Sequence, residues 1–194
     1  MDCMEAIRNR RSVRSFTSQP VDPELVQSLL EAANMAPSSR NSQPWAFWTF
    51  MDASCIRTIG QEVKAWIFHV PPDEPFASPM RPVISAIDYE VFYGAPVLIL
   101  VLARSTAQEA RDACCLAAEN LMLAARAAGL GSSWVGIATD WFSLPETKRK
   151  LAIPANYSVV VPLVVGYPDA WPTETDRRLP EVRWCTLANK PADA

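Results

Sequence analysis

Histidine and glycine are scarce in this chain of 194 residues. The single histidine, His69, excludes metal sites that need two imidazole ligands and leaves a Ser/His or Cys/His catalytic pair only one candidate base. The six glycines form neither the G-x-x-x-x-G-K-[ST] loop nor the G-x-G-x-x-G fingerprint. The common phosphate-binding loops of nucleotide-binding proteins are therefore absent.

Cysteine pairs and long apolar runs are also missing. The odd number of cysteines and the lack of C-x-x-C spacing argue against a disulfide framework and predict reduced, mostly buried thiols at Cys3, Cys55, Cys114, Cys115 and Cys185. The longest apolar run, Ala95–Ala103, has about nine residues where a membrane-spanning helix needs about 20, and the first residues lack the pattern of a signal peptide. We therefore expect a cytoplasmic protein with no membrane partner.

The composition is that of an ordinary globular protein. The chain is 49% hydrophobic and 20% charged, and its length fits a single domain over residues 1–194. The 18 Lys and Arg residues against 21 Asp and Glu give a net charge of −3, which offers no general attraction for nucleic acid. A nucleic-acid partner is not expected.

Apolar periodicity predicts helices and strands in alternation. Helical spacing predicts helices over residues 23–35, 54–68 and 107–128, and a capping-box pattern at Ser143 predicts a short helix that ends near Leu151. Aromatic or continuously apolar runs predict strands over residues 45–51, 95–102 and 157–165. This order predicts helices and a sheet packed as layers of one domain.

The helix predicted over residues 107–128 has an unusually wide apolar surface. Its charged residues Arg111, Asp112, Glu119 and Arg126 share one narrow arc, and Ala, Leu, Met and Cys occupy most of the remainder. Such a helix must be covered by other elements on several sides, and a small domain has few helices and strands that can cover it. We expect a core helix that also serves a subunit interface; a purely intramolecular core helix is the alternative.

Two stretches lack a regular pattern. Five prolines between residues 71 and 82 exclude a regular helix or a central strand and predict a loop or lid. Residues 168–194 mix prolines with polar residues and show no helical or strand period. We expect this C-terminal segment to be an arm that packs on another surface, such as a partner subunit.

Two groups of arginines are candidates for binding an anion. The first group, with a serine among its members, lies within seven positions and consists of Arg8, Arg10, Arg11, Ser12 and Arg14. Guanidinium groups match phosphate oxygens bidentately and the hydroxyl adds a donor, although a solvated basic face at a helix end is the alternative. Arg177 and Arg178 in the arm form the second group, and the two groups could meet on one anion.

A polar loop and two glycines complete the candidate residues. Residues 37–44 join a predicted helix to a predicted strand and offer hydrogen-bonding side chains at Ser38, Ser39, Asn41 and Gln43, with a simple hydrogen-bonded turn as the alternative. Gly129 suits the cap that ends a helix. Gly136 lacks a Cβ atom, so its backbone N–H can approach a flat ligand closely.

Four blocks of the sequence carry a resemblance to a known family. They are Ile7–Arg14, Ala36–Trp45, Asn120–Ala125 continuing into Gly129–Trp134, and Val164–Pro168. In this order, over nearly the whole chain, they resemble the nitroreductase family of FMN-dependent oxidoreductases. The proline-rich stretch lies outside the resemblance.

The resemblance implies an α+β fold with a central, mainly antiparallel sheet flanked by helices. It also implies an intertwined homodimer with FMN at the interface. Arg10, Arg11, Ser12 and Arg14 would then hold the phosphate, the ribityl chain and the pyrimidine, with Arg14 near N1 and the C2 carbonyl. Either Arg177 or Arg178 would close on the phosphate.

The resemblance assigns the remaining contacts to a second subunit and to one glycine. The polar loop of the other subunit would surround the ring and the ribityl chain with Pro37, Ser38, Ser39, Asn41 and Gln43. The Gly136 backbone would face flavin N5. A common form of the family has a second glycine after this one, whereas this chain has Ile137, a departure that bears on the shape of the pocket near N5.

The implied activity is transfer of a hydride from NAD(P)H through flavin N5 to a small acceptor such as a nitroaromatic or a quinone. No catalytic acid or base is implied. Residues that could line the substrate side are Trp66, Phe68, His69, Tyr93 and Trp141, with core packing as the alternative for each aromatic side chain. Three other functions stay open: a flavoenzyme of the same fold that does not use NAD(P)H, a non-catalytic flavin- or nucleotide-binding module, and an RNA-binding protein that uses the N-terminal arginines.

Overall fold

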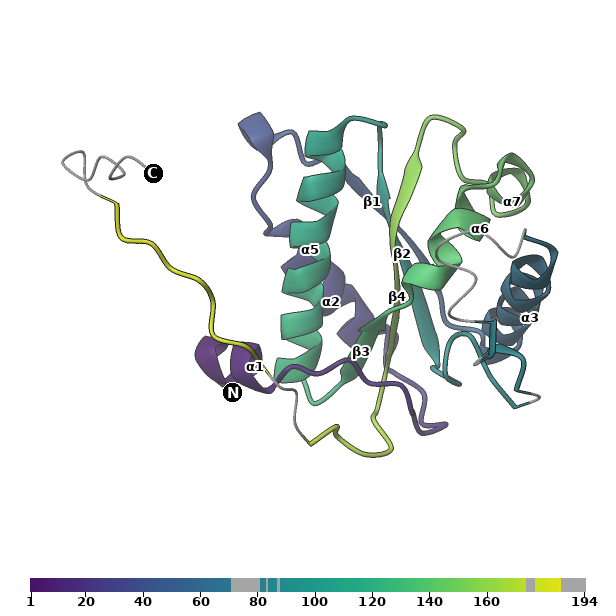
Figure 1. The fold of residues 1–194 in the computed structure, drawn as a ribbon, viewed down its shortest axis with the longest axis horizontal. Helices are drawn as coiled ribbons and strands as arrows, with labels where there is room; N and C mark the ends of the chain where they lie inside the picture. Colours follow the sequence, from purple (N-terminus) through teal and green to yellow (C-terminus); the bar gives the residue numbers. More distant parts are fainter. Residues whose placement is uncertain (71–80, 83, 87, 174–176, 186–194) are drawn as a thin grey trace, which may run out of the picture.

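A four-stranded sheet runs through the centre of the computed structural model (Figure 1). The structure describes residues 1–70, 81–82, 84–86, 88–173 and 177–185. The strands lie in the order β1-β2-β4-β3 and every neighbouring pair is antiparallel. Their bounds are β1 Trp45–Phe50, β2 Val97–Ala103, β3 Gly131–Trp134 and β4 Ser158–Gly166. The expected mainly antiparallel sheet is confirmed.

Helices cover both faces of the sheet. In Figure 1, α2 (Pro23–Asn34) and α5 (Gln108–Ala127) lie on one side, and α3 (Ala53–His69) and α6 (Thr139–Ser143) lie on the other. Strand β2 is buried along its whole length and its side chains alternate between two cores. This arrangement has the layers that the sequence pattern predicts and the α+β architecture that the family resemblance implies.

Helix α5 has nearly the predicted bounds and lies in the core. Its buried positions are mostly small, including Ala113, Ala117 and Ala118, so the helix packs closely on the sheet and on α2. Leu116, on the same helix, is exposed. The core role is confirmed, and the role in a subunit interface stays a prediction.

Local signals set the ends of the long helices. The Asp22 carboxylate accepts a hydrogen bond from the Glu24 backbone N–H at 2.8 Å, and Pro23 occupies the first helical position. Gly129 follows α5 with a φ of +79°, as expected for a glycine that ends a helix.

The predicted capping box at Ser143 is wrong. Helix α7 (Pro145–Lys150) begins after Leu144 and has no side-chain cap. Ser143 instead ends α6, and its hydroxyl donates to the Thr139 carbonyl at 2.9 Å. Because a proline at the first helical position has no N–H that needs a partner, α7 can start without a serine cap.

Three short elements were not predicted: α1 (Cys3–Asn9), β3 and α6. Helix α1 is held by a capping box in which Asp2 and Glu5 bond each other's backbone N–H groups. Strand β3 follows Gly129, and its four residues are too few to show an alternating apolar pattern.

The cysteines are free, as expected, but the expectation of mostly buried thiols is wrong. Only Cys114 is buried, and burial raises the pKa of its thiol to about 12. Cys3 and Cys55 lie in the first turns of α1 and α3, and Cys185 lies in the C-terminal arm, and all three are exposed.

Most of the predicted proline-rich loop, residues 71–80, lies outside the described residues. Its last residues, Arg81 and Pro82, lie in a helical turn in which the Ser85 N–H donates to the Arg81 carbonyl. The arm is described over residues 168–173 and 177–185. Residues 168–173 pack on their own chain, where the Asp169 N–H donates to the Ser15 carbonyl, whereas residues 177–185 have no helix or strand and extend away from the body (Figure 1). No helix within the described ranges has the length and apolar character needed to cross a membrane.

Candidate functional site

The candidate site begins where α1 ends and the chain becomes extended. Residues 10–16, the arginine segment, run along one end of the sheet. The Val13 N–H donates to the Ser132 carbonyl at 3.0 Å, and the Asp169 N–H donates to the Ser15 carbonyl at 3.1 Å. Val13 is fully buried, whereas Ser12 and Arg14 on either side of it are exposed. The sheet thus fixes the segment and presents Ser12 and Arg14 to solvent.

Two glycines make room for this segment. Gly131 and Gly166 pair directly across β3 and β4 and form the glycine rung of the sheet. A Cβ atom on Gly131 would lie 2.7 Å from Val13 Cγ2, and one on Gly166 would lie 3.0 Å from Phe16 Cδ1 and 2.6 Å from a ring carbon of Pro96. The arginine segment can approach the sheet this closely only because the rung carries no side chains.

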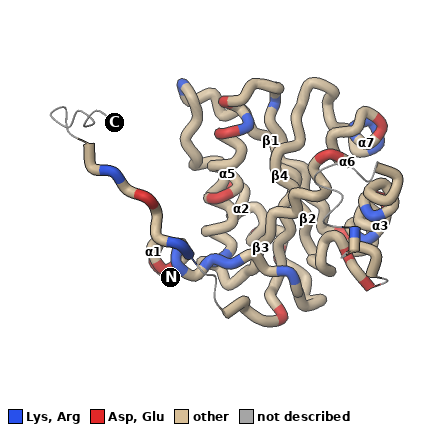
Figure 2. The backbone as a smooth tube through the Cα atoms, in the orientation of Figure 1, with Lys and Arg blue, Asp and Glu red and all other residues tan. Residues whose placement is uncertain are grey.

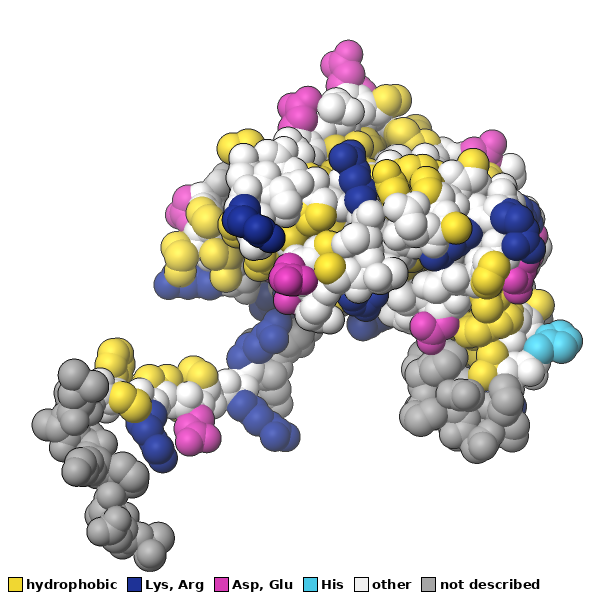
Figure 3. Space-filling view, turned by 90° about the horizontal axis from the view of Figure 1, so that it is seen from above, with side chains coloured by type: hydrophobic (Ala, Val, Ile, Leu, Met, Phe, Trp, Pro, Cys, Tyr) yellow, Lys and Arg dark blue, Asp and Glu magenta, His cyan; other side chains and the backbone are white. Residues whose placement is uncertain are grey.

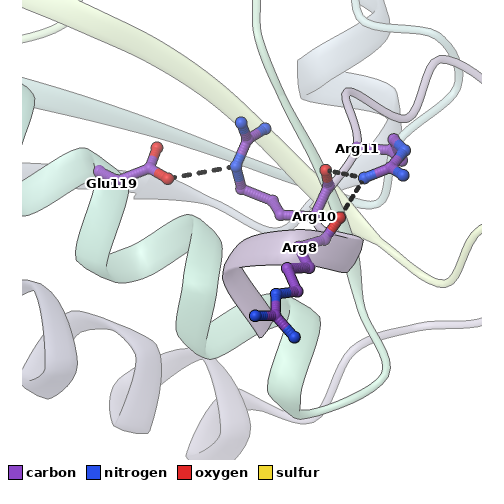
Figure 4. Close-up of polar contacts among 4 residues, drawn as sticks. All are labelled: Arg8, Arg10, Arg11 and Glu119. Atoms are coloured by element: carbon purple, nitrogen blue, oxygen red, sulfur yellow. Dashed lines mark hydrogen bonds and ion pairs between the residues drawn. The ribbon is translucent and has the colours of Figure 1, made fainter. Parts of the chain in front are cut away.

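The neighbouring arginines Arg10 and Arg11 point in different directions (Figure 4). Arg10 Nε donates to Glu119 Oε1 on α5 at 3.2 Å, and its two Nη atoms form no hydrogen bond with the described residues. Arg11 Nη1 instead donates to the carbonyls of Arg8 and Arg10, at 2.7 and 2.9 Å. Arg10 therefore keeps a free pair of donors, while Arg11 partly braces the backbone.

A surplus of positive charge remains beside Arg11. The Nε atoms of Arg11 and Arg126 are buried and have no hydrogen-bond partner among the described residues. Burial, together with the Arg11 charge, lowers the pKa of Arg126. The Arg126 guanidinium lies 3.6 Å from the ring centroid of Trp171. Figure 2 shows Lys and Arg residues gathered around α1 and the start of the arm. Such a region is chemically suited to an anion.

Arg14 lies close enough to Tyr89 to affect its titration. Burial, and then the nearby Tyr93, raise the pKa of Tyr89 to about 12, and the Arg14 charge opposes this rise. The two tyrosine rings meet edge to face with centroids 6.4 Å apart. Tyr93 has a φ of +57°, a left-handed backbone that few large residues adopt. The segment before β2 therefore joins the arginine segment at the site.

A cavity of about 420 Å³ lies between α3 and residues 88–95. Tyr89 lines it, together with apolar side chains such as Ile56 and Phe92. Arg57 and Glu90 contribute charged groups to its wall and approach each other to 3.6 Å. Tyr89, whose pKa the Arg14 charge lowers, is thus also part of the wall of this cavity.

The polar loop, residues 37–44, has its own internal hydrogen bonds and lies far from the arginine segment. Within it, the Gln43 N–H donates to Ser38 Oγ at 2.9 Å and Gln43 Nε2 donates to Asn41 Oδ1 at 3.1 Å. Arg40, Asn41 and Gln43 all have positive φ values. The loop precedes Trp45, which pairs with Ala103, and Ala103 pairs with Ser158 at the start of β4.

The glycine rung lies at the other end of β4, eight residues further on, which corresponds to about 26 Å at the usual rise of an extended strand. The loop and α1 also lie at opposite ends of the molecule in Figure 1. One chain therefore does not bring the polar loop and the arginine segment together.

Gly136 is open to solvent directly after β3. A Cβ atom there would meet only Trp134 Nε1, at 3.9 Å. Trp134 is 43% exposed, whereas Ile137 packs against the core on the α3 side of the sheet. The backbone at Gly136 is thus accessible, and the side chain of Ile137 is partly buried.

A family model described as the nitroreductase family matches residues 7–167. The chain belongs to the nitroreductase family. The match includes the arginine segment, the polar loop, Gly136 and the glycine rung, so the sequence resemblance is confirmed.

Relatives in this family carry different names. A 5,6-dimethylbenzimidazole synthase from Rhodospirillum rubrum is 31% identical over 175 residues, which cover 82% of this chain and 78% of that protein. An iodotyrosine deiodinase from Thermotoga neapolitana is 30% identical over 178 residues, which cover 84% of this chain and 86% of that protein. Membership of the family therefore does not by itself fix the reaction.

The nitroreductase-like fold is confirmed by solved structures. A crystal structure of a nitroreductase with bound FMN from Bacteroides fragilis matches with a TM-score of 0.83 and 24% identity. The match covers 96% of this chain and 100% of that chain.

The remaining predicted residues are less closely tied to the site. Arg177 and Arg178 are exposed and form no hydrogen bond or ion pair with the described parts of the chain. Trp141 packs into the core against Phe142, with ring centroids 5.1 Å apart. Phe68 is exposed near the end of α3, and His69 Nδ1 lies 2.8 Å from the Ala65 carbonyl. The core alternative is correct for Trp141.

Three contributors to the site were missed from the sequence. Glu119 and Arg126 were noted only as part of the charged arc of α5, and Tyr89 was not singled out. Their partners Arg10, Arg11 and Arg14 are more than 70 residues away along the chain. Periodicity gives the face of a helix that a charge occupies, and it does not give the partner on another element.

Proposed function

We propose that this member of the nitroreductase family is an FMN-dependent oxidoreductase that works as an intertwined homodimer. It would pass a hydride from NAD(P)H to a small acceptor such as a nitroaromatic or a quinone. The observation that carries the proposal is the arginine segment, which is fixed on the glycine rung and keeps cationic donors free. The Bacteroides fragilis structure of the same fold has FMN bound.

The residues present fit a flavin nucleotide. The free Nη atoms of Arg10 and the unpartnered Nε of Arg11 suit a phosphate, and the exposed Ser12 hydroxyl can add a donor. Arg177 or Arg178 would complete the phosphate site once the arm is in place. The open backbone at Gly136 suits a flat ring, whose N5 it would face.

The distance between the two parts of the site supports a dimer. The polar loop cannot reach the arginine segment of its own chain, so Pro37, Ser38, Ser39, Asn41 and Gln43 would come from the partner. Figure 3 shows hydrophobic side chains along the described part of the arm, clear of the body. Leu179 is 95% exposed and Trp184 is 87% exposed, and a second chain would cover them.

When bound, FMN supplies the redox chemistry, because its N5 accepts a hydride from NAD(P)H and delivers electrons to the acceptor. The protein residues bind the flavin and tune how easily it is reduced. Arg14, near N1 and the C2 carbonyl, would stabilise negative charge there and so ease reduction. Tyr89 keeps its proton well above neutral pH and can donate a hydrogen bond in the same region. No side chain is assigned as an acid or base.

An absorbance spectrum of the purified full chain tests this function. We expect a yellow protein with the flavin bands, which bleach when NADH or NADPH is added without oxygen and return when a quinone is added. A colourless protein that does not take up FMN would contradict the proposal. Equal amounts of NADH and NADPH, added to separate samples, would identify the preferred donor.

A flavoenzyme of this fold that does not use NAD(P)H is the second candidate. It is favoured by the 31% identical relative, whose name is that of a synthase. A yellow protein that binds FMN but is not bleached by either pyridine nucleotide would support it. Steady oxidation of NAD(P)H with a quinone acceptor would exclude it.

A further inference from the structure

We propose that Glu119 is a positioning residue that orients Arg10 toward the phosphate of the bound nucleotide. The proposal rests on the proposed function, because it requires that Arg10 bind this phosphate. Glu119 lies on α5, more than 100 residues from Arg10 along the chain.

The geometry divides the Arg10 guanidinium into two parts. Glu119 Oε1 accepts from Arg10 Nε at 3.2 Å, so the carboxylate holds the nitrogen nearest the aliphatic chain (Figure 4). The two Nη atoms at the far end have no partner among the described residues. These two nitrogens can present parallel N–H donors to two oxygens of one phosphate.

Arg10 is held at two points, its backbone N–H and its side-chain Nε. Its backbone N–H donates to the Ala6 carbonyl at 2.8 Å, which anchors Arg10 at the end of α1. Its side chain is 19% exposed, against 45% for Glu119. A free arginine loses much rotamer entropy when it binds a ligand, and a carboxylate that already holds Nε reduces this loss.

Arg11 shows what happens without such a carboxylate. It lies next to Arg10 in the sequence, but its Nη1 donates to two backbone carbonyls, whereas neither Nη atom of Arg10 has a partner among the described residues. Glu119 therefore contacts only one of two adjacent arginines, and we infer that this contact keeps the Nη atoms of Arg10 available for the phosphate. It also offsets part of the repulsion among the clustered cations.

A positioning role and simple electrostatics predict opposite signs. By charge alone, removing the negative Glu119 should strengthen the binding of an anionic phosphate. If Glu119 orients Arg10, its removal should weaken phosphate binding, because the loss of orientation outweighs the loss of repulsion. The sign of the change therefore identifies the role.

The test compares FMN with riboflavin, which has the same ring and ribityl chain but no phosphate. The full chain, freed of flavin, is titrated with each ligand and flavin fluorescence is followed. We expect Glu119→Gln to weaken FMN binding roughly three- to tenfold and to leave riboflavin binding unchanged. The matched control is Glu109→Gln, which removes the same charge from an exposed position in the first turn of α5. It should leave FMN binding unchanged or slightly stronger.

A second variant shows whether Glu119 acts through Arg10. In an Arg10→Ala chain, adding Glu119→Gln should cause no further loss of FMN affinity. Unfolding midpoints of the flavin-free variants confirm that each is folded. If the wild type prefers FMN over riboflavin and Glu119→Gln behaves like Glu109→Gln, the positioning role is wrong while the phosphate site stands. If the wild type binds both flavins equally, the phosphate site fails and the role of Glu119 fails with it.

Discussion

The arginine segment and the polar loop are two halves of one expected site, and they are built in different ways. The arginine segment depends on distant parts of the chain, since it is held by Ser132, Asp169 and the glycine rung. The polar loop is held by its own residues, through the bonds of Gln43 to Ser38 and Asn41. The first half exists only in the folded domain, whereas the second is a local structure displayed at the opposite end of the sheet.

Mixed dimers are expected to show the largest effect. One chain carries Arg10→Glu, which repels the phosphate, and the other carries Ser39→Trp, which fills the polar loop. We expect each variant alone to lose FMN binding. A mixed dimer should recover one FMN per dimer, because one of its sites combines the unaltered arginine segment of one chain with the unaltered loop of the other. Chains with two different affinity tags allow the mixed dimer to be isolated and its flavin counted.

The control is a dimer of two wild-type chains carrying the same two tags, which should bind two FMN molecules. If both halves of each site came from the same chain, the mixed dimer would bind none. That result would overturn the division of the site between subunits.

The dependence of the arginine segment on packing predicts a large effect at the glycine rung. Gly131→Ala places a Cβ atom against the fully buried Val13, and overpacking of this kind costs about 1–3 kcal/mol of unfolding free energy. Val13→Ala in the same chain should restore part of this loss by removing the clashing methyl groups. Urea unfolding of the single and double variants measures both effects. A Gly131→Ala variant as stable as the wild type would show that the segment is free to move away from the sheet.

Arg14 and Asn41 test whether the charge of the arginine segment, and not of the polar loop, affects the flavin. Arg14→Ala should lower the reduction potential of bound FMN by about 30 mV, since loss of a nearby cation disfavours the added negative charge. Asn41→Ala in the polar loop, which removes no charge, should change the potential much less. Redox titration of the flavin spectrum against a reference dye compares the two variants. An unchanged potential in Arg14→Ala, with FMN bound, would remove Arg14 from the N1 edge.

Tyr89 gives the smallest expected effect and concerns stability alone. Its pKa is about 12 in the folded protein against an ordinary 10.0, so folding protects its proton. The stability it confers is fully present below pH 10 and is lost as the pH rises toward 12. Tyr89→Phe should therefore lose less stability between pH 9 and pH 11 than the wild type does. Urea midpoints at these pH values measure the slope.

The wild-type slope has a second source, because the pKa of Cys114 is also raised to about 12. This part should persist in Tyr89→Phe. An identical slope in the two proteins would mean that Tyr89 is not protected by folding.

The long elements could be predicted from the sequence because each carries its own signal. Asp22 and Pro23 start α2, Gly129 ends α5, and the continuous apolar run of β2 indicates a strand buried on both faces. The short strand β3 could not be predicted, since its four residues contain two serines that are buried only because β4 and the arginine segment enclose them. Tertiary structure decides such elements.

The candidate site shows the same division. The polar loop and the arginine segment are each a single continuous stretch of the sequence, so their chemistry is visible there. Glu119 and Tyr89 act on Arg10 and Arg14 from other elements, and their contributions depend on how the helices and the sheet are packed. The sequence shows which charged and polar groups are present, whereas only the fold shows which of them lie next to each other.

The left-handed residues of the polar loop have a consequence for assembly. Arg40, Asn41 and Gln43 adopt an unfavourable backbone within the isolated chain, so the cost of shaping this loop is met while each chain folds. In the proposed homodimer, a loop prepared in this way would dock without an ordering step. The slow, concentration-dependent stage of assembly would then fall to the C-terminal arm, whose exposed apolar side chains a second chain would cover.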